Sequence, residues 1–243
     1  MKSSPPNYAF PELYVKMNND RNYKSLNIDS EIFCGSSRLL IIGGSHSGKT
    51  YFVQKLVLRH HDKFKKIVIC GTPNLLLQYS ETKDKTKIYD TIQNPFKEQD
   101  DDDDDKRSSL YIIDDLMSEA YNSQVVNDIF SKGRHHNISV ILILQSYFPT
   151  GSAKSLIPQI KNNATIQIFF RLRNQAELAL VAKKLEFDKK SQEFFLDLIK
   201  KEVCGKRYGY IAIFLDELNP EGRYRNNLVF DDKTEYETVY TQK

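Results

Sequence analysis

The chain of 243 residues has no long apolar segment and few cysteines. Its longest apolar run, residues 138–144, has the length of a strand and falls far short of the roughly 20 residues that a membrane helix needs. The polar, Pro-containing residues 1–6 offer no apolar stretch of the kind found in a signal peptide. We therefore expect a soluble protein that is not secreted and has no membrane partner.

Cysteine and histidine are also too sparse, and too unevenly placed, to suggest a metal site. Cys34, Cys70 and Cys204 lie far apart, so we expect free thiols in a reducing compartment. The pairs His60–His61 and His135–His136 each place neighbouring side chains in different directions, with no further ligand three or four positions away. These residues predict no bound metal.

Charge is distributed unevenly along the chain. The formal net charge of +3 includes the six carboxylates of the run Asp100 to Asp105, so the remainder carries +9. A basic remainder permits an anionic partner. The Asp run itself is typical of a self-repelling disordered loop, and the alternative is an acidic contact for a protein partner or a mimic of DNA.

Apolar runs alternate with amphipathic stretches, which predicts a single α/β domain with a mostly parallel central sheet and helices on both faces. We expect an irregular arm at 1–30 with at most one short strand, a globular domain at 31–215 with an acidic loop at 97–107, and an extension at 216–243. Strands are expected at 38–42, 66–70, 110–113, 138–144, 165–170 and 210–215, and helices at 49–60, 118–131, 175–185 and 191–201.

Between the first strand and the first helix stands a Gly-x-x-x-x-Gly-Lys-Thr motif. It consists of Gly43, Gly44, Ser45, His46, Ser47, Gly48, Lys49 and Thr50. Its glycines let successive N–H groups face inward, and the helix N-terminus adds positive potential for phosphates. Lys49 is expected to reach the β- and γ-phosphates of ATP, and the Thr50 hydroxyl to bind Mg²⁺. The alternative is a glycine-rich turn without a ligand.

Two carboxylates, Asp114 and Asp115, follow the third predicted strand. Mg²⁺ prefers hard oxygen ligands and retains several waters, so Asp114 is expected to support the metal through water. Asp115 would polarise the water that attacks the γ-phosphate. Adjacent carboxylates are costly to bury without a cation, which favours a metal site over a simple strand exit.

Several specialised classes of P-loop protein lack support in this chain. It has no Asn-Lys-x-Asp segment for guanine recognition and no Leu-Ser-Gly-Gly-Gln run of the transporter ATPases. A small-molecule kinase would carry a lid after the fourth strand, where this chain continues with sheet and helix patterns. A RecA-like P-loop ATPase remains the prediction.

Residues 131–146 combine Gly-Arg-His, Asn-Ile-Ser, an apolar strand and a terminal Gln, and they precede a strand that ends Phe-Phe-Arg. This block resembles the FtsK–HerA superfamily of DNA-pumping ATPases. It is most similar to the genome-packaging ATPases of poxviruses, giant viruses, virophages and Polinton-type elements. The resemblance spans roughly residues 37–185 and starts with the strand that enters the phosphate loop.

The resemblance implies roles for two further residues. Gln145 matches the polar residue that senses the γ-phosphate, and Arg134 matches a finger directed at the nucleotide of the neighbouring subunit. Arg171 and Arg173 are rival fingers. A polar strand end and a helix-end arginine favoured by the helix dipole are the simpler interpretations. The superfamily usually has Glu where this chain has Asp115.

The resemblance also implies a function. The family pumps double-stranded DNA into a viral capsid as a homo-oligomeric ring, a pentamer or hexamer, with a capsid or portal-vertex protein as partner. The expected location is the host cytoplasm or viral factory, with association to the virion. The alternatives are a cellular or plasmid DNA translocase of the same superfamily and a nucleotide-dependent binding switch without turnover.

Basic residues that could grip DNA phosphates stand near predicted helix or strand ends. Ordinary solvated helix faces are the alternative for each. The candidates are Lys154, Lys161, Arg171, Arg173, Lys183, Lys184, Lys189, Lys190, Lys200, Lys201, Lys206 and Arg207.

Overall fold

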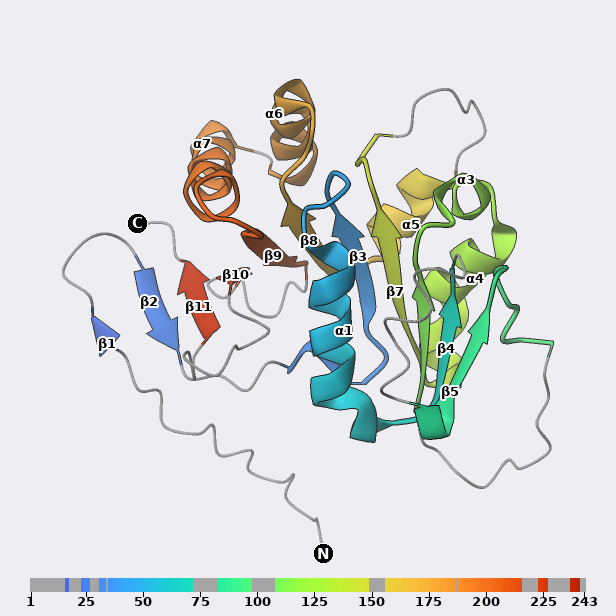
Figure 1. Cartoon of the computed structure of the whole chain (residues 1–243). Coiled ribbons are helices and arrows are strands. Elements are labelled where there is room, and N and C mark those ends of the chain that lie inside the picture. Colours follow the sequence, from blue (N-terminus) through green and yellow to red (C-terminus); the bar gives the residue numbers. More distant parts are fainter. Residues whose placement is uncertain are drawn as a thin grey trace, which may run out of the picture.

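The computed structural model describes residues 16–17, 23–26, 31–33, 35–71, 83–97, 108–148, 156–186, 188–215, 223–226 and 237–240. Its strands form a single 11-stranded sheet with the order β1-β2-β11-β10-β9-β8-β3-β7-β6-β4-β5. Helices lie against this sheet, and α1 crosses in front of β3 in Figure 1. The chain therefore adopts the α/β architecture that the alternating pattern predicts.

The centre of the sheet is parallel, and its strands are apolar runs because both of their faces are buried. β3 pairs with β7 and β8, and β6 pairs with β7 and β4, all in parallel. The bounds are β3 Arg38–Ile42, β4 Phe64–Cys70, β5 Thr86–Tyr89, β6 Ser108–Ile113, β7 Ile138–Leu144 and β8 Ile166–Phe170. β5 lies between the second and third predicted strands, where the sequence predicts no strand.

One edge of the sheet is antiparallel, which the sequence does not predict. From β8 outward, the strands are β9 Tyr210–Phe214, β10 Tyr224–Asn226, β11 Glu237–Tyr240, β2 Tyr23–Leu26 and β1 Lys16–Met17. β1 and β2 both come from the predicted arm, for which the sequence predicts one short strand at most, and β10 and β11 come from the predicted extension. Both flanking segments thus contribute strands to the main sheet, and the division at residues 30 and 215 stays a prediction.

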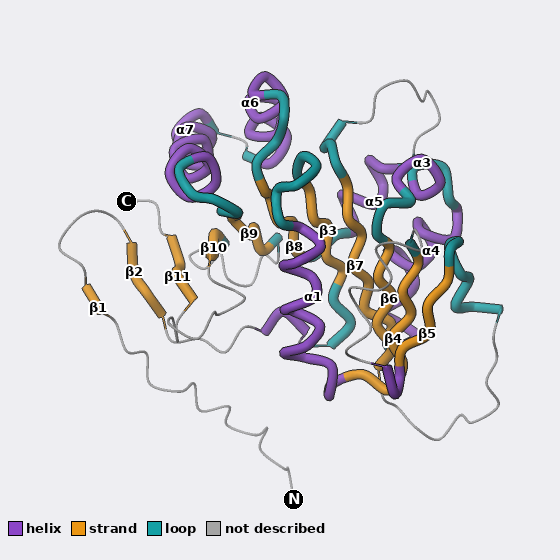
Figure 2. The backbone as a smooth tube through the Cα atoms, in the orientation of Figure 1, coloured by secondary structure: helices purple, strands orange, loops and turns teal. Residues whose placement is uncertain are grey.

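Helices cover both faces, as expected. The backbone tube in Figure 2 follows α1 Lys49–His60 along the sheet and α6 Gln175–Leu185 and α7 Lys189–Leu198 at its upper left. Alternate strand residues face opposite cores: Leu39 and Ile41 pack with α1, whereas Leu40 and Ile42 pack with the helices of the other face. The period of two in β3 therefore supports two separate hydrophobic layers.

The predicted helix over 118–131 is wrong in its boundaries. The segment breaks into α3 Met117–Ala120 and α4 Gln124–Lys132, and Ser123 between them caps α4 by accepting a hydrogen bond from Val126 N. α5 Ile157–Asn163 completes the α-helices of the described residues. Short 3₁₀ helices include η1 Glu31–Phe33, η2 His61–Lys63 and η4 Gly133–His136, and η5 Ile199–Cys204 is a π-helix that prolongs α7.

Some sequence predictions lie outside the described residues, including the Asp run, Cys34 and Lys154. Cys70 is a buried free thiol and Cys204 an exposed one. Within the described ranges, no helix is long and apolar enough to cross a membrane. The same ranges hold no cluster of three His, Cys, Asp or Glu side chains that could bind a metal ion.

Candidate functional site

The phosphate loop runs from the carboxyl end of β3 to the N-terminus of α1, where parallel strands of the sheet end together. Gly43 N donates to Leu144 O at 3.1 Å, and Gly44 N donates to Arg171 O at 2.8 Å. These bonds tie the loop to the ends of β7 and β8. Gly48 caps α1 with a φ of +99°, a left-handed conformation that side chains with a Cβ rarely adopt.

Lys49 lies folded against its own loop. Its side chain is only 8% exposed, and Nζ donates to Gly43 O at 2.7 Å and to Gly44 O at 2.8 Å. Burial lowers the pKa of Lys49, while Asp114 and Asp115 act in the opposite direction. An ammonium group has three donors, so this arrangement leaves one for a phosphate oxygen.

Thr50 and Asp114 form the first contact between the loop and the end of β6. Thr50 Oγ1 donates to Asp114 Oδ2 at 3.0 Å. Asp114 is 4% exposed, and its own N–H donates to Cys70 O at the end of β4. A buried carboxylate beside a threonine hydroxyl is a hard-oxygen donor set of the kind that Mg²⁺ selects, so these residues fit this metal.

Asp115 and Gln145 form the second contact, between the ends of β6 and β7. Gln145 Nε2 donates to Asp115 Oδ1 at 3.4 Å, and Ser45 Oγ donates to Gln145 Oε1 at 3.5 Å. Both bonds are long, and both side chains are exposed. Asp115 has a φ of +57°, and Asp tolerates this left-handed region better than most residues do.

A cavity of about 960 Å³ joins these groups, which is ample for a small-molecule ligand. It is lined by five of the candidate residues from the sequence: Lys49, Thr50, Asp114, Asp115 and Gln145. Other lining residues have no recognisable sequence signal, because they come from separate elements. They are Tyr51 of α1, Met117 of α3, Ile143 of β7 and Tyr208 of the turn before β9.

The three candidate arginine fingers lie at different ends of the sheet. Arg171 and Arg173 are exposed and line a second cavity, of about 620 Å³, beside the loop. Arg134 is also exposed but precedes the amino end of β7, where it lines another cavity together with Arg38. The length of β7 puts Arg134 roughly 20 Å from the phosphate loop of its own subunit.

Lys161 does not lie on the surface as a DNA contact would. Its side chain is 6% exposed, and Nζ donates to Tyr147 O and lies 3.6 Å from the centre of the Tyr147 ring. Burial lowers its pKa to about 8. The other described candidates are exposed, but three of them form ion pairs four residues apart: Lys189 with Glu193, Lys201 with Asp197, and Lys206 with Glu202.

The strand order, the phosphate loop and the Asp-Asp and Gln strand ends together define a P-loop ATPase. A family model described as "Poxvirus A32 protein" matches residues 23–242, so the chain belongs to this family. The match confirms the resemblance to viral genome-packaging ATPases of the FtsK–HerA type. Among curated proteins, no sequence matches the chain.

Solved structures confirm the fold. The genome packaging NTPase B204 from Sulfolobus turreted icosahedral virus 2, in complex with AMP, is 19% identical with a TM-score of 0.50. In complex with AMPPCP, the same NTPase is 18% identical with a TM-score of 0.51. Each comparison covers 74% of this chain and 93% of the other, so the shared fold includes most of the chain.

Proposed function

We propose that the chain is an ATP-driven motor that moves double-stranded DNA into a viral capsid. The observation that carries this proposal is the meeting of two polar pairs, Thr50 with Asp114 and Asp115 with Gln145, around the buried Lys49. Membership of a viral family supports the packaging task. The related structures with AMP and AMPPCP support a nucleotide as ligand.

In this proposal the loop binds ATP with Mg²⁺. The loop N–H groups and Lys49 would hold the β- and γ-phosphates, and Thr50 and Asp114 would hold the metal, Asp114 through water. The bound metal would neutralise charge that develops on the phosphate oxygens. Ser47 Oγ is buried without a hydrogen-bond partner, which supports a further donor to a ligand oxygen in the cavity.

Asp115 and Gln145 would divide the work of hydrolysis. The exposed Asp115 carboxylate would orient and polarise the attacking water. Gln145 contacts both Asp115 and Ser45 of the loop, so loss of the γ-phosphate would change its hydrogen bonds. Because Gln145 directly follows β7, this change would pass into the sheet and towards elements that grip DNA.

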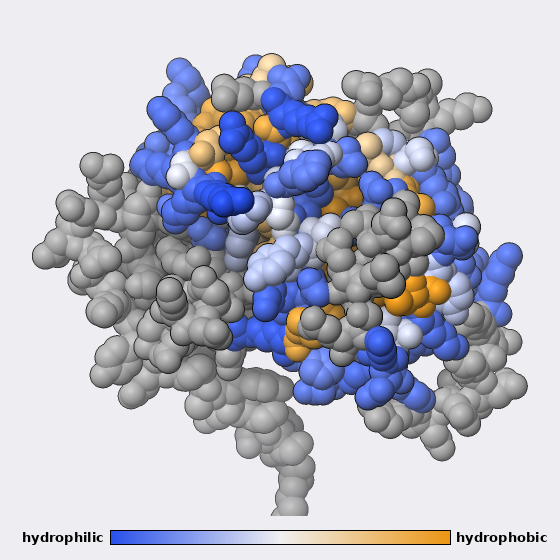
Figure 3. Space-filling model, viewed as in Figure 1, coloured by the Kyte–Doolittle hydropathy of each residue, from blue (hydrophilic) through white to orange (hydrophobic). Residues whose placement is uncertain are grey.

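DNA would be held by cations on the outer elements. Hydrophilic side chains are numerous over α6 and α7 in Figure 3. Lys183 and Lys184 of α6 and Lys200 of η5 are exposed. Arg171 and Arg173 add charge beside the loop. We further propose a homo-oligomeric ring, a pentamer or hexamer, with Arg134 directed at the neighbouring nucleotide. Its partner would be a capsid or portal-vertex protein in the host cytoplasm or viral factory.

The test is ATP hydrolysis by the full chain with and without linear duplex DNA. Unmodified protein should hydrolyse ATP faster with DNA, and Lys49→Ala should lose binding or turnover. Lys65→Ala is a matched control, because Lys65 is an exposed lysine near the amino end of β4, the end of the parallel sheet opposite to the phosphate loop. ATP binding without hydrolysis, whether or not DNA is present, would indicate a binding switch and refute the motor.

A further inference from the structure

A second cavity lies on the other side of the phosphate loop from the Asp114 and Asp115 carboxylates. It is lined by Arg171, Leu172 and Arg173 after β8 and by the turn at 203–209 before β9. Ser45, His46, Ser47 and Tyr208 line this cavity and the larger one as well. The two cavities therefore adjoin each other at residues 45–47 of the phosphate loop.

The topology determines which part of a nucleotide each cavity can take. The carboxylates and Gln145 stand at the ends of β6 and β7, where the metal and the γ-phosphate belong. β8 adjoins β3 on the side away from β7. If a triphosphate lies along the loop with its γ-phosphate near Gln145, its nucleoside must lie on the β8 side, in the second cavity.

Tyr208 lines both cavities and has an unusual backbone conformation. Its φ is +61°, its side chain is 54% exposed, and its ring lies over the backbone of Gly48. A Cβ on Gly48 would be 3.1 Å from Tyr208 Cδ1, which shows how closely the ring packs there. An exposed aromatic ring held in a strained backbone is a feature that clusters at ligand sites.

The local structure around Tyr208 holds this strain in place. The π-helix η5 precedes the turn, and such helices are frequent at functional sites. Gly209 follows Tyr208, and a Cβ there would lie 2.0 Å from Glu202 O, so only glycine allows the turn to close against η5. The Arg207 guanidinium lies 5.1 Å from the centre of the Tyr208 ring and supports it.

We infer that this second cavity receives the base of the bound nucleotide, with Tyr208 as its stacking surface. Leu172, Leu178 and Val203 provide a buried apolar wall, and a volume of about 620 Å³ is within the range of small-molecule sites. Arg171 and Arg173 lie beside Gly44 of the loop, where a Cβ on Gly44 would be 3.0 Å from Arg173 Cγ and 3.4 Å from Arg171 O. The α-phosphate would pass these residues. The inference rests on the proposed binding of ATP phosphates by the loop.

Comparing ATP with inorganic tripolyphosphate, which has no base, tests the inference. Tyr208→Ala should weaken ATP binding about tenfold, the loss expected for one base–aromatic stack, and leave tripolyphosphate binding close to that of unmodified protein. Tyr208→Phe, which retains the ring, should recover most of the lost ATP affinity. An equal loss for both ligands, or unchanged ATP affinity in Tyr208→Ala, would overturn the inference.

Two further measurements test the loop assignment and a DNA contact in place of the base. Lys49→Ala should lose both ligands, and if it bound ATP normally the loop assignment and this inference would both fail. The second measurement is the binding of duplex DNA by Tyr208→Ala. If this variant loses DNA affinity but retains ATP affinity, the cavity is a DNA contact and the base assignment is overturned.

A measurement on unmodified protein avoids any dependence on how the variants fold. Cys204 is exposed and lines the same cavity. ATP should therefore slow the reaction of Cys204 with N-ethylmaleimide, followed by peptide mass spectrometry, whereas tripolyphosphate should not. Equal protection by the two ligands, or none by ATP, would contradict a base in this cavity.

Discussion

At the scale of single residues, the two buried lysines Lys49 and Lys161 have different roles. Lys49 donates to carbonyls of its own loop, whereas Lys161 of α5 donates to Tyr147 O just after β7. Glu177 of α6 accepts hydrogen bonds from Ser146 Oγ and Tyr147 N, so the same turn is held from two helices. Lys161 thus supports the chain that leaves Gln145.

The lowered pKa of Lys161 predicts a pH dependence of stability. Its folded pKa of about 8, lowered by burial and by Lys184 and raised by Glu177, lies below the unfolded value of 10.5. Between these values the unfolded state binds more protons, so the free energy of unfolding contributed by Lys161 rises with pH. In urea unfolding, the free energy of unfolding of the unmodified chain should rise relative to that of Lys161→Met between about pH 8 and about pH 10. Parallel pH profiles for the two proteins would contradict the assignment.

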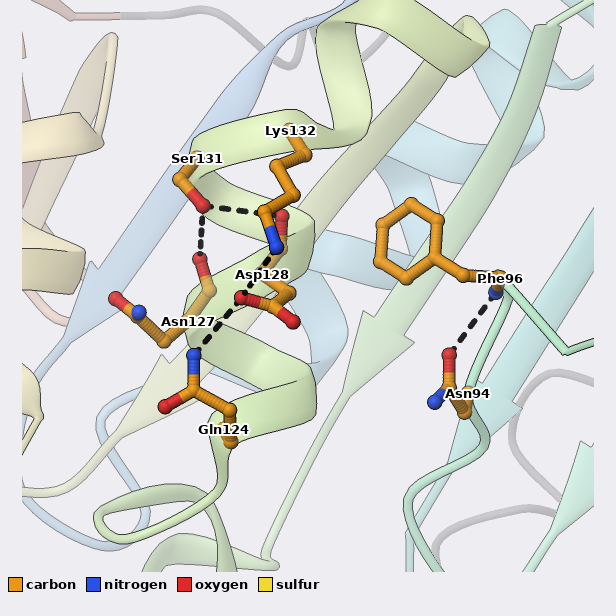
Figure 4. A network of polar contacts seen from close by, with 7 residues as sticks. All are labelled: Asn94, Phe96, Gln124, Asn127, Asp128, Ser131 and Lys132. Carbon is orange, nitrogen blue, oxygen red and sulfur yellow. Dashed lines mark hydrogen bonds and ion pairs between the residues drawn. The ribbon is translucent and has the colours of Figure 1, made fainter.

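At the scale of elements, α4 shows how local polar contacts support a helix. Asp128 accepts from Gln124 Nε2 at 2.8 Å and pairs with Lys132 Nζ at 3.3 Å, each four residues away. Ser131 Oγ donates to Asn127 O one turn earlier, as Figure 4 shows. The same view includes the turn in which Phe96 N donates to Asn94 Oδ1. The two side-chain pairs of Asp128, with Gln124 and with Lys132, contribute a few tenths of a kcal/mol each to the helix.

The start of α4 offers a matched pair of serines. Ser123→Ala removes the acceptor for Val126 N and should lower the free energy of unfolding by about 1 kcal/mol. Ser118 is exposed within the short α3, so Ser118→Ala should change the stability little. Urea unfolding of both variants checks the difference. A larger loss of unfolding free energy in Ser118→Ala than in Ser123→Ala would instead support the single helix over 118–131 that the sequence predicts.

At the scale of the whole molecule, the nucleotide site and Arg134 lie at opposite ends of the parallel strands. Arg134 is exposed beside Arg38, whose pKa is lowered first by burial and then by the charge of Arg134. Arg134 is too distant from the loop of its own subunit to touch a phosphate there. Any catalytic contact by Arg134 therefore requires a second copy of the chain, as in the proposed ring.

Mixed oligomers test this arrangement. Arg134→Ala should retain ATP binding but lose turnover by about 10³-fold or more, the loss typical of a missing arginine finger. Mixing it with Lys49→Ala should restore part of the activity, since each subunit supplies what the other lacks. The exposed neighbour Lys132 gives the control variant Lys132→Ala. Verified mixed rings without restored turnover would exclude Arg134 as a finger acting between subunits.

The sequence by itself determined the class of fold and placed most of the residues of the proposed nucleotide site. A phosphate loop is a contiguous motif whose backbone geometry follows from its own glycines and from the flanking strand and helix. Asp114, Asp115 and Gln145 could be placed beside it because the carboxyl ends of parallel strands meet at one edge of the sheet. Local pattern and a general rule of topology were sufficient here.

Only the tertiary structure decided the features that depend on distant segments. The antiparallel edge joins β2 and β11 through main-chain hydrogen bonds, which leave little trace in a short polar strand. Lys161 is buried by packing against Tyr147, a contact that no spacing predicts. Tyr208 reaches Gly48 because η5 and Gly209 close a turn against each other. Long-range packing, rather than local pattern, therefore completes the second side of the phosphate loop.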